Sequence, residues 1–399
     1  MKCLILTSEY PPSIGGVGNA AATFAKEMSA RGWVIEIATI SINAHPEWEQ
    51  ASEGIIHRLS LSGDASCWNP LSGEVARLET LIADFSPDVA VIHGWQGWCV
   101  RVVPRLNSAK IPIVLQSHGF GMHRVPWHVR PPFGLKAWAG YAPFILQLPH
   151  FIRKLYTLSV LSKEPKLLTG FDHWVGYRSG CKNVVTIPNG VEKIQTSSEE
   201  FFKTCPLANK KQVVLCVANY CDRKNQILAL DAARRINKED VFFAFVGGEQ
   251  NAYYLELNKR IKAWGLEKRV ALFHNVSRSF TESAIRACDI ALMTSKWEMQ
   301  PLFLLETMSA GKPWISTNVG SVSELQGGIV SKFSADAVAS NLFNLLRSGN
   351  QRESLGKVGV TQWGTEFSKE VVYDRWQQLL VSAIKKNSKK NAHCANHNR

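Results

Sequence analysis

The chain has 399 residues, 45% of them hydrophobic, with 46 Lys and Arg against 33 Asp and Glu, which gives a formal net charge of +13. At roughly 100–200 residues per domain, this length predicts two globular domains with ordinary hydrophobic cores. No apolar run reaches the ~18–20 residues that a membrane-spanning helix needs, and the first residues read as a buried strand, not as an export signal. We therefore expect a protein that is neither exported nor membrane-spanning.

Nine cysteines are scattered singly, and no Cys-x-x-Cys pair occurs. This pattern predicts a reducing compartment, and hence a cytoplasmic protein, with neither a disulfide framework nor a zinc site. The excess of positive charge suggests an anionic partner. Composition alone leaves that partner open between a nucleotide, a membrane surface and a nucleic acid.

Short β-branched and apolar runs alternate with helix-length segments, which is the pattern of parallel sheets covered by helices on both faces. The first half has predicted strands at 3–8, 34–40, 88–93, 113–117, 156–161 and 184–188, and predicted helices at 19–31 and 73–85. The second half restarts the pattern, with strands at 213–217, 241–246, 270–274, 290–294 and 313–316, and helices at 226–236, 253–264, 279–288 and 302–310. The predicted fold class is therefore α/β, with two doubly wound domains.

The domain boundaries are read from this repetition. We predict an N-terminal domain over 1–192, a polar linker over 193–210, a C-terminal domain over 211–366 and a final helix over 367–384. The remaining residues, 385–399, are basic and rich in Asn, and they are predicted to be disordered.

The first predicted strand leads into a loop that contains Gly15 and Gly16 and then into a helix of small residues. Glycines at this place let backbone N–H groups approach an anion at a helix N-terminus, so phosphate or sugar binding is the favoured interpretation. The stretch 16–21 also fits G-x-G-x-x-A, with Glu36 near the place of a dinucleotide-binding acid. The longer loop before these glycines disfavours a nicotinamide dinucleotide, and an ordinary glycine-rich turn stays open.

His118 follows the predicted strand 113–117. Ligands in open α/β sheets bind outside the carboxyl ends of the strands, so His118 is a candidate ligand contact. A histidine that is hydrogen-bonded within its own loop fits the sequence equally well.

The segment 295–313 carries the strongest functional signal. A predicted strand ends, Glu298 lies in the loop that follows, Pro301 begins a helix at its favoured first position, and Glu306 lies about a turn and a half further on. Two carboxylates with this spacing suit hydrogen bonds from two hydroxyl pairs, one on a sugar and one on a ribose. The alternative, in which Glu306 is a solvated helix residue and Glu298 an acid at a helix start, is disfavoured because apolar positions surround Glu306.

These residues, in this order, resemble the retaining glycosyltransferases of family four, which have the GT-B fold: two facing Rossmann-like domains with the active site in the cleft between them. The resemblance covers nearly the whole chain and includes the Ile-Pro-Asn-Gly-Val, Phe-Val-Gly-Gly and Val-Gly-Ser-Val-Ser-Glu sequences at 187–191, 245–248 and 319–324. It implies a glycosyltransferase of the hexosyltransferase type. The donor would be a UDP- or GDP-sugar and the acceptor a glycan or a lipid-linked molecule, in envelope polysaccharide or glycolipid biosynthesis.

The resemblance also implies roles for single residues. Glu306 would bind the nucleotide ribose, and Glu298 would bind hydroxyl groups of the donor sugar. Gly15 and Gly16 would lie on the diphosphate side, and His118 would contact the sugar or its phosphate. The remaining expected donor contacts are Gln300, Pro301 and Leu302. No cofactor and no metal are expected, since Asp-x-Asp, the metal-clamping sequence of other transferases, does not occur in the chain.

One position departs from the family pattern. After the strand 213–217 the family commonly has an arginine and, about five residues on, a lysine, and both grip the diphosphate. Here Lys224 matches, but Asn219 replaces the arginine. We predict that Arg223 compensates, because adjacent cations at a helix start can both reach an anion. The expected catalytic residues are therefore His118, Glu298 and Lys224, with an exposed helix-start lysine as the alternative for Lys224.

The segment 122–154 interleaves basic and aromatic residues. Three interpretations stay open: contact with an anionic membrane surface, an acceptor groove, or plain packing against the first domain. Nucleic-acid binding is not expected, because no recognisable motif accompanies the aromatic residues. The membrane interpretation predicts a peripheral protein on the inner face of the cytoplasmic membrane.

Two other functions are compatible with the same nucleotide contacts. A GT-B epimerase or hydrolase would bind the nucleotide sugar in a similar way, and a non-catalytic binding protein would bind it without turnover. The presence of both glutamates together with His118 and Lys224 favours a transferase.

Overall fold

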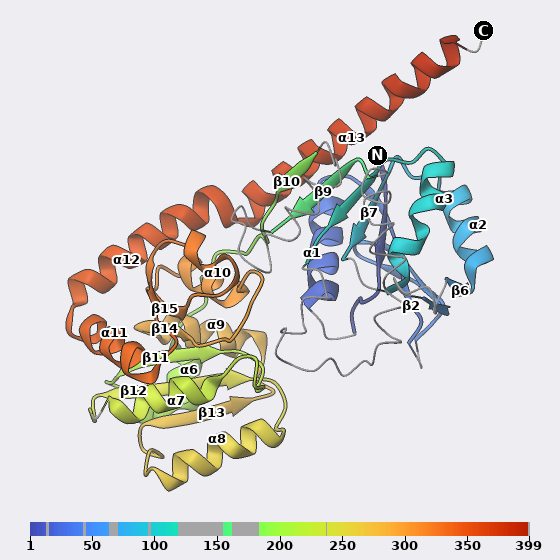
Figure 1. The fold of residues 1–399 in the computed structure, drawn as a ribbon. Helices are drawn as coiled ribbons and strands as arrows, with labels where there is room; N and C mark the ends of the chain where they lie inside the picture. Colours follow the sequence, from blue (N-terminus) through green and yellow to red (C-terminus); the bar gives the residue numbers. More distant parts are fainter. Residues whose placement is uncertain are drawn as a thin grey trace, which may run out of the picture. The chain divides into compact units, whose positions relative to one another are not determined.

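The computed structural model describes residues 1–12, 16–42, 45–63, 71–94, 97–118, 155–161, 183–236 and 238–397. The chain divides into two compact units, of which the first contains Met1–Ile187 and Tyr373–Arg399 and the second contains Pro188–Val372 (Figure 1). Each unit has its own mainly parallel sheet with helices packed against it, so the predicted α/β class is confirmed. Within the described residues, no helix is both long enough and apolar enough to cross a membrane.

The main sheet of the first unit has the strand order β10-β9-β8-β7-β1-β2-β4-β3, in which β3 is antiparallel to β4 and the other neighbours are parallel. Its strands are β1 (Lys2–Thr7), β2 (Val34–Ile40), β3 (Trp48–Ala51), β4 (Gly54–Leu59), β7 (Val89–His93), β8 (Ile113–Gln116), β9 (Thr157–Val160) and β10 (Val184–Thr186). A separate pair is formed by β5 (Leu61–Ser62) and β6 (Ser72–Gly73). The helices are α1 (Gly16–Ala30), α2 (Val75–Phe85), the 3₁₀ helix η1 (Gly97–Val102) and α3 (Val103–Ser108).

Strand β1 is buried on both faces. Leu4 and Leu6 lie in one apolar cluster with residues of α2 and α3, whereas Ile5 between them is fully buried outside that cluster. Successive side chains of a strand point to opposite faces, so a strand covered on both sides needs a continuous apolar run. This is why the first residues of the chain are apolar without alternation.

The sheet of the second unit is parallel throughout and has the order β13-β12-β11-β14-β15-β16. The strands are β11 (Gln212–Val217), β12 (Val241–Gly247), β13 (Val270–His274), β14 (Ile290–Met293), β15 (Trp314–Thr317) and β16 (Gly328–Ser331). The helical segments are α6 (Glu199–Thr204), η3 (Pro206–Ala208), α7 (Gln226–Arg235), α8 (Ala252–Ala263), α9 (Arg278–Ala287), α10 (Leu302–Ser309), η4 (Gly320–Glu324), α11 (Ala335–Arg347), α12 (Gly349–Gln362) and η5 (Trp363–Phe367). The last helix, α13 (Lys369–His397), begins in this unit and belongs to the first unit from Tyr373 onward. This is the doubly wound order, and the winding direction reverses between β11 and β14.

Two apolar clusters cover the two faces of this second sheet. Val213 and Leu215 of β11 lie in a cluster with residues of α9 and α10. Val214 and Cys216, the alternate residues, lie in a second cluster with residues of α7, α8 and α11. The helices on both faces hold the carboxyl ends of β11 and β14 at one edge of a rigid layer.

Several segments differ from the sequence prediction. The stretch 193–210, predicted to be a linker, contains α6 and η3, and Phe201 of α6 is fully buried against Phe273 and Phe280. The residues 385–399 were predicted to be disordered, but α13 continues as a helix to His397. The sequence after Gly364 has neither Gly nor Pro, so no residue there ends the helix.

Candidate active site

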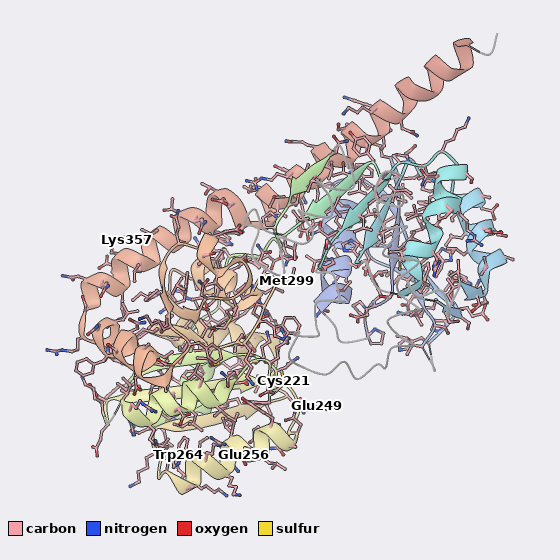
Figure 2. The ribbon with its side chains drawn as sticks, in the orientation of Figure 1. Cys221, Glu249, Glu256, Trp264, Met299 and Lys357 are labelled. Atoms are coloured by element: carbon pink, nitrogen blue, oxygen red, sulfur yellow. The ribbon has the colours of Figure 1, made fainter. Side chains whose placement is uncertain are left out.

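Two loops of the second unit begin where β11 and β14 end. These strands are parallel neighbours on the two sides of the winding reversal, and ligands of open α/β sheets bind at such a point. Figure 2 labels one residue in each loop, Cys221 after β11 and Met299 after β14. Lys224 and Glu298, which the sequence analysis selected independently, lie in these two loops.

The structure joins these two residues directly. Lys224 Nζ lies 2.6 Å from Oε1 of Glu298, and Arg223 Nη1 lies 3.1 Å from Oε2. The hydroxyl of Ser295 also donates to Oε1, at 2.7 Å. The Glu298 side chain is only 7% exposed, so these donors compensate a carboxylate that burial would otherwise penalise.

Backbone contacts hold the two loops together. The N–H of Lys296 donates to the carbonyl of Arg223 at 2.8 Å, and the Thr294 hydroxyl donates to the carbonyl of Asn225 at 2.9 Å. Asn225 has a positive φ of 50°, which ends the first loop just before α7. The loop that carries the cations and the loop that carries the carboxylate are therefore hydrogen-bonded to each other.

Gly320 packs closely against the main chain of the second loop. Its φ is +53°, and a Cβ at this position would lie 2.4 Å from the carbonyl oxygen of Met299 and 2.5 Å from that of Glu298. The next residue, Ser321, donates its N–H to the Met299 carbonyl at 2.9 Å. A side chain at Gly320 would push the loop that carries Glu298 out of place.

Arg223, the residue predicted to compensate for Asn219, has two contacts in the second loop. The Arg223 guanidinium contacts Glu298 and also lies over the Trp297 ring, with 4.7 Å between the guanidinium carbon and the ring centroid. Asn219 lies beside Gly248, where a Cβ would approach its side-chain oxygen to 3.1 Å. The structure thus brings Arg223, and not Asn219, onto the buried carboxylate.

The other expected donor contacts lie around the start of α10. Gln300 accepts a hydrogen bond from the N–H of Asn189 at 2.6 Å, which ties this loop to the Ile-Pro-Asn-Gly-Val segment. Pro301 is the residue before the helix, one position earlier than predicted, and Leu302 is the first helical residue. The Leu302 side chain is among the exposed large apolar groups, at 41%, so it is available to a ligand.

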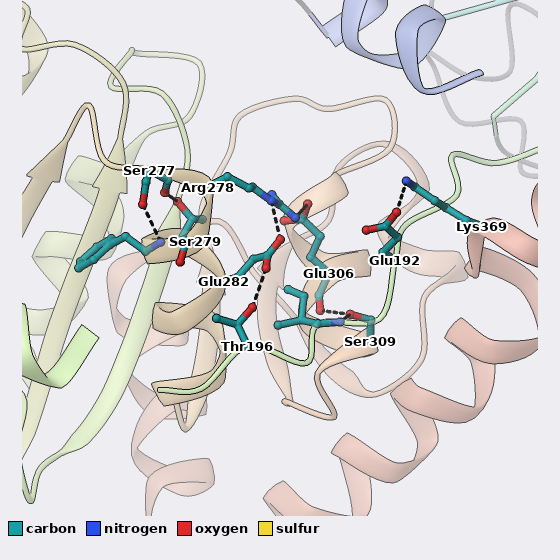
Figure 3. A network of polar contacts seen from close by, with 12 residues as sticks. Glu192, Thr196, Ser277, Arg278, Ser279, Glu282, Glu306, Ser309 and Lys369 are labelled. Carbon is teal, nitrogen blue, oxygen red and sulfur yellow. Dashed lines mark hydrogen bonds and ion pairs between the residues drawn. The ribbon is translucent and has the colours of Figure 1, made fainter. Parts of the chain in front are cut away.

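Glu306, in the middle of α10, has a different partner. Arg278 Nη2 lies 2.7 Å from its Oε1, and the Glu306 side chain is 13% exposed (Figure 3). Burial raises the pKa of Glu306 above its ordinary value, although the nearby Arg278 charge acts in the opposite direction. A carboxylate held in this way has lone pairs left for hydroxyl donors.

In the first unit, His118 follows β8 and pairs with His93 at the end of β7. The His93 Nδ1 and His118 Nε2 atoms are 3.1 Å apart and share one hydrogen bond, and the rings are stacked with centroids 5.4 Å apart. Burial lowers the pKa of His118 to about 4 and that of His93 well below its ordinary value, the latter also through the His118 charge. Both rings are therefore neutral near pH 7.

The remaining predictions concern the glycine loop and the aromatic segment. Gly16 is the first residue of α1, so its backbone N–H lies at a helix N-terminus. Gly15 and the segment 122–154 lie outside the described residues.

Among the described residues that contact the predicted set, His93, Ser295 and Arg278 were not predicted from the sequence. His93 is the last residue of one predicted strand, and His118 directly follows another. These strands, β7 and β8, are parallel neighbours, so their carboxyl ends lie side by side. Arg278 begins α9, 28 residues before Glu306, so only the packing of α9 against the sheet reveals the pair. Ser295 lies in the segment 295–313, and its position three residues before Glu298 could have indicated a hydrogen bond between the two side chains.

Two family models match separate parts of the chain. The model of the glycosyl transferases group 1 matches residues 197–360, and that of the glycosyl transferase 4-like domain matches residues 15–155. Together these two glycosyltransferase models cover most of the chain, and the chain is a glycosyltransferase. The family expected from the sequence motifs is thereby confirmed.

Among characterised relatives, this glycosyltransferase is 27% identical over 164 residues to the alpha-1,3/1,6-mannosyltransferase ALG2 of Dictyostelium discoideum. The match covers 35% of this chain and 39% of that protein, so it spans well under two thirds of the relative.

Two solved structures resemble this glycosyltransferase over nearly its whole length. A sucrose-phosphate synthase from Thermosynechococcus elongatus has a TM-score of 0.75 at 17% identity, covering 97% of this chain and 100% of that one. The Anabaena protein Alr3699/HepE in complex with UDP has a TM-score of 0.72 at 17% identity, covering 96% of this chain and 100% of that one. At such identities the likeness concerns the fold, and the predicted GT-B fold is confirmed.

Proposed function

We propose that this glycosyltransferase transfers a sugar from a nucleoside-diphosphate sugar to a glycan or lipid-linked acceptor. The observation that carries the proposal is the group formed by Arg223, Lys224 and Glu298 at the winding reversal of the second sheet. A donor of this class needs cations for its diphosphate and carboxylates for its hydroxyl groups, and both are present there. Donor identity is proposed as a UDP- or GDP-sugar, and a UDP-bound fold relative supports the first of these.

Lys224 and Arg223 are proposed to stabilise the negative charge that develops on the leaving diphosphate. Charged groups that are held in place before the reaction are commonly the largest contribution to catalysis. Glu298 is proposed to accept hydrogen bonds from the hydroxyl groups of the donor sugar. Glu306 is proposed to accept hydrogen bonds from the two hydroxyl groups of the ribose. The proposed role of His118 is contact with the sugar or its phosphate as a neutral imidazole.

We propose a retaining mechanism. The bond between the anomeric carbon and the diphosphate oxygen breaks, and a bond to the acceptor oxygen forms on the same face. The acceptor proton passes to an oxygen of the leaving diphosphate, so the products are the glycoside and the nucleoside diphosphate. The anomeric configuration of the product, read by NMR, tests this step, because an inverted product contradicts it.

The decisive experiment is a panel of nucleotide sugars scored by thermal shift and then by product analysis. A donor at about 100 times its dissociation constant adds about 2.7 kcal/mol of stability, which is readily detected. Product analysis with and without a glycan acceptor separates a transferase from a hydrolase or an epimerase. Binding without turnover above background would instead identify a non-catalytic binding protein.

We further propose that turnover needs no metal or cofactor, because Lys224 and Arg223 supply positive charge at the place proposed for the diphosphate. Turnover in excess EDTA is then expected within about twofold of the untreated rate, which is a change of under ~0.5 kcal/mol in the barrier. A loss of activity that Mg²⁺ restores would contradict this part of the proposal.

For the acceptor, we propose a lipid-linked or envelope glycan that the enzyme meets at the inner face of the cytoplasmic membrane. The support is the net charge of +13 together with the basic and aromatic residues of 122–154. Cosedimentation with anionic and neutral vesicles at low and high salt tests it, with a chain ending at Lys386 as the control for the basic C-terminus. Absence of binding to anionic vesicles at low salt would overturn membrane recruitment.

A further inference from the structure

A line of polar contacts runs from the segment before α6 through α9 to Glu306 (Figure 3). The Thr196 hydroxyl donates to Oε2 of Glu282 at 2.7 Å, and Arg278 Nε donates to Oε1 of Glu282 at 2.9 Å. The same guanidinium reaches Glu306 Oε1 through Nη2 at 2.7 Å. Arg278 is therefore held between two carboxylates, although 59% of its side chain is exposed.

The charges of this group suit neutral hydroxyl donors better than an anion. One guanidinium faces the two carboxylates of Glu282 and Glu306, so the group carries an excess of negative charge. A diphosphate would be repelled there, whereas hydroxyl groups can donate to carboxylate oxygens. Within the described part of the chain, the side-chain hydrogen bond to Glu306 comes from Arg278, which contacts Oε1.

We propose that Arg278 is a positioning residue for the donor ribose, which holds the Glu306 carboxylate through Oε1 and leaves its other lone pairs to the ribose hydroxyl groups. This inference rests on the proposed function, since it takes the donor ribose to bind at Glu306. Glu282 and Thr196 orient the guanidinium from the opposite side. Arg278 acts through Glu306 and need not contact the donor.

The electrostatics of Glu306 support this role. Burial raises the pKa of Glu306, the Arg278 charge lowers it, and Glu282 on the same helix as Arg278 raises it. Among the described residues, these are the charged groups that affect Glu306. Removing Arg278 therefore raises the pKa of Glu306 further, and the ionised carboxylate needed for diol binding is then lost at a higher pH.

The test measures the affinity of the full chain for UDP, GDP and their 2′-deoxy counterparts by calorimetry between pH 5.5 and 8.5. The variants are Arg278→Ala and Arg278→Lys, with Glu306→Gln as the reference for loss of the carboxylate. Arg260→Ala is the control, because Arg260 also pairs with a carboxylate of the second unit, Glu256 on α8, at 2.7 Å (Figure 2 labels Glu256).

For the wild type we expect the ribonucleotide to bind about tenfold more tightly than its 2′-deoxy counterpart, the value of one charge-assisted hydrogen bond. In Arg278→Ala this preference should shrink at low pH and recover toward pH 8.5, whereas Glu306→Gln should lack it at every pH. Arg278→Lys restores the positive charge but cannot contact the carboxylates of Glu282 and Glu306 at the same time. Its preference for the ribonucleotide should therefore recover at a lower pH than that of Arg278→Ala. Arg260→Ala should match the wild type.

Two results would overturn the inference. The first is an Arg278→Ala variant with the wild-type preference at every pH. The second is a loss of affinity in Arg278→Ala that is equal for the ribonucleotide and its 2′-deoxy counterpart and independent of pH. That result would indicate a structural role only. Absence of binding of either nucleoside diphosphate to the wild type overturns the proposed function itself, and is thus distinguishable from both.

Discussion

Lys224 Nζ lies 2.6 Å from Oε1 of Glu298, although 74 residues separate the two in the chain. The lysine proposed for the diphosphate is thus neutralised, in the free protein, by the carboxylate proposed for the donor sugar. Donor binding then replaces one anion beside Lys224 with another. This exchange has consequences that can be measured.

Glu298→Gln is expected to bind the nucleoside diphosphate more tightly and to turn over the donor more slowly. The amide no longer competes with the diphosphate for Lys224 and Arg223, so affinity for UDP or GDP should rise severalfold. Turnover should fall by about 10²-fold, because an amide accepts weaker hydrogen bonds from the sugar than a carboxylate does. Calorimetry and initial rates measure the two effects.

The control for that variant is Glu353→Gln, since Glu353 forms an exposed pair with Lys357 on α12. It should leave both affinity and turnover unchanged. Weaker diphosphate binding by Glu298→Gln would show that the carboxylate does not mask the cations.

Lys224→Ala should lower turnover by about 10²-fold or more, and Arg223→Ala by about tenfold, because both remove positive charge proposed for the leaving group. The smaller effect is expected for Arg223, whose bond to Glu298 is longer, at 3.1 Å against 2.6 Å. Lys296→Ala is the matched control, since Lys296 pairs with Asp222 in the same two loops. Wild-type kinetics for Arg223→Ala would show that this arginine does not compensate for Asn219.

Gly320→Ala is expected to lower both stability and turnover. The new Cβ would overlap the carbonyl oxygens of Met299 and Glu298, and φ at this position is +53°. The cost in unfolding free energy should be about 1–3 kcal/mol, and turnover should fall because the loop that carries Glu298 must move. Gly349→Ala is the control, as a Cβ there has no atom within 4 Å. Normal turnover in Gly320→Ala would mean that the loop tolerates the shift.

Acidification should destabilise the protein through the His93 and His118 pair. The pKa of His118 is lowered to about 4 by burial, against 6.5 in the unfolded chain, so the unfolded state binds more protons between these values. The stability from this histidine is fully present above about pH 6.5 and is lost as the pH falls toward about 4. The loss amounts to up to about 3 kcal/mol.

The measurement is the unfolding free energy from denaturant curves between pH 4 and 7.5. His118→Gln should flatten the profile in this range and reduce turnover at pH 7. A wild-type profile with no decline below pH 6.5 would contradict the lowered pKa of His118.

Much of the fold was readable from the sequence, because parallel strands covered on both faces are continuous apolar runs. The predicted ranges 34–40 and 270–274 coincide with β2 and β13, and the other predicted strands differ by small shifts at their ends. The strands β3, β4, β5, β6 and β16, which are short or partly exposed, were missed. Their burial depends on neighbours in the sheet, which no local pattern records.

The sequence by itself determined which residue types were present for the site: two carboxylates separated by seven residues, a lysine after one strand and a histidine after another. Their local spacing reflects strand ends and a helix start, which are short-range features. Only the tertiary structure decided the partners: Lys224 and Arg223 with Glu298, Arg278 with Glu306, and His93 with His118. These pairs form because strand order places distant loops at one sheet edge, and burial makes an unpaired charge costly enough to select its partner.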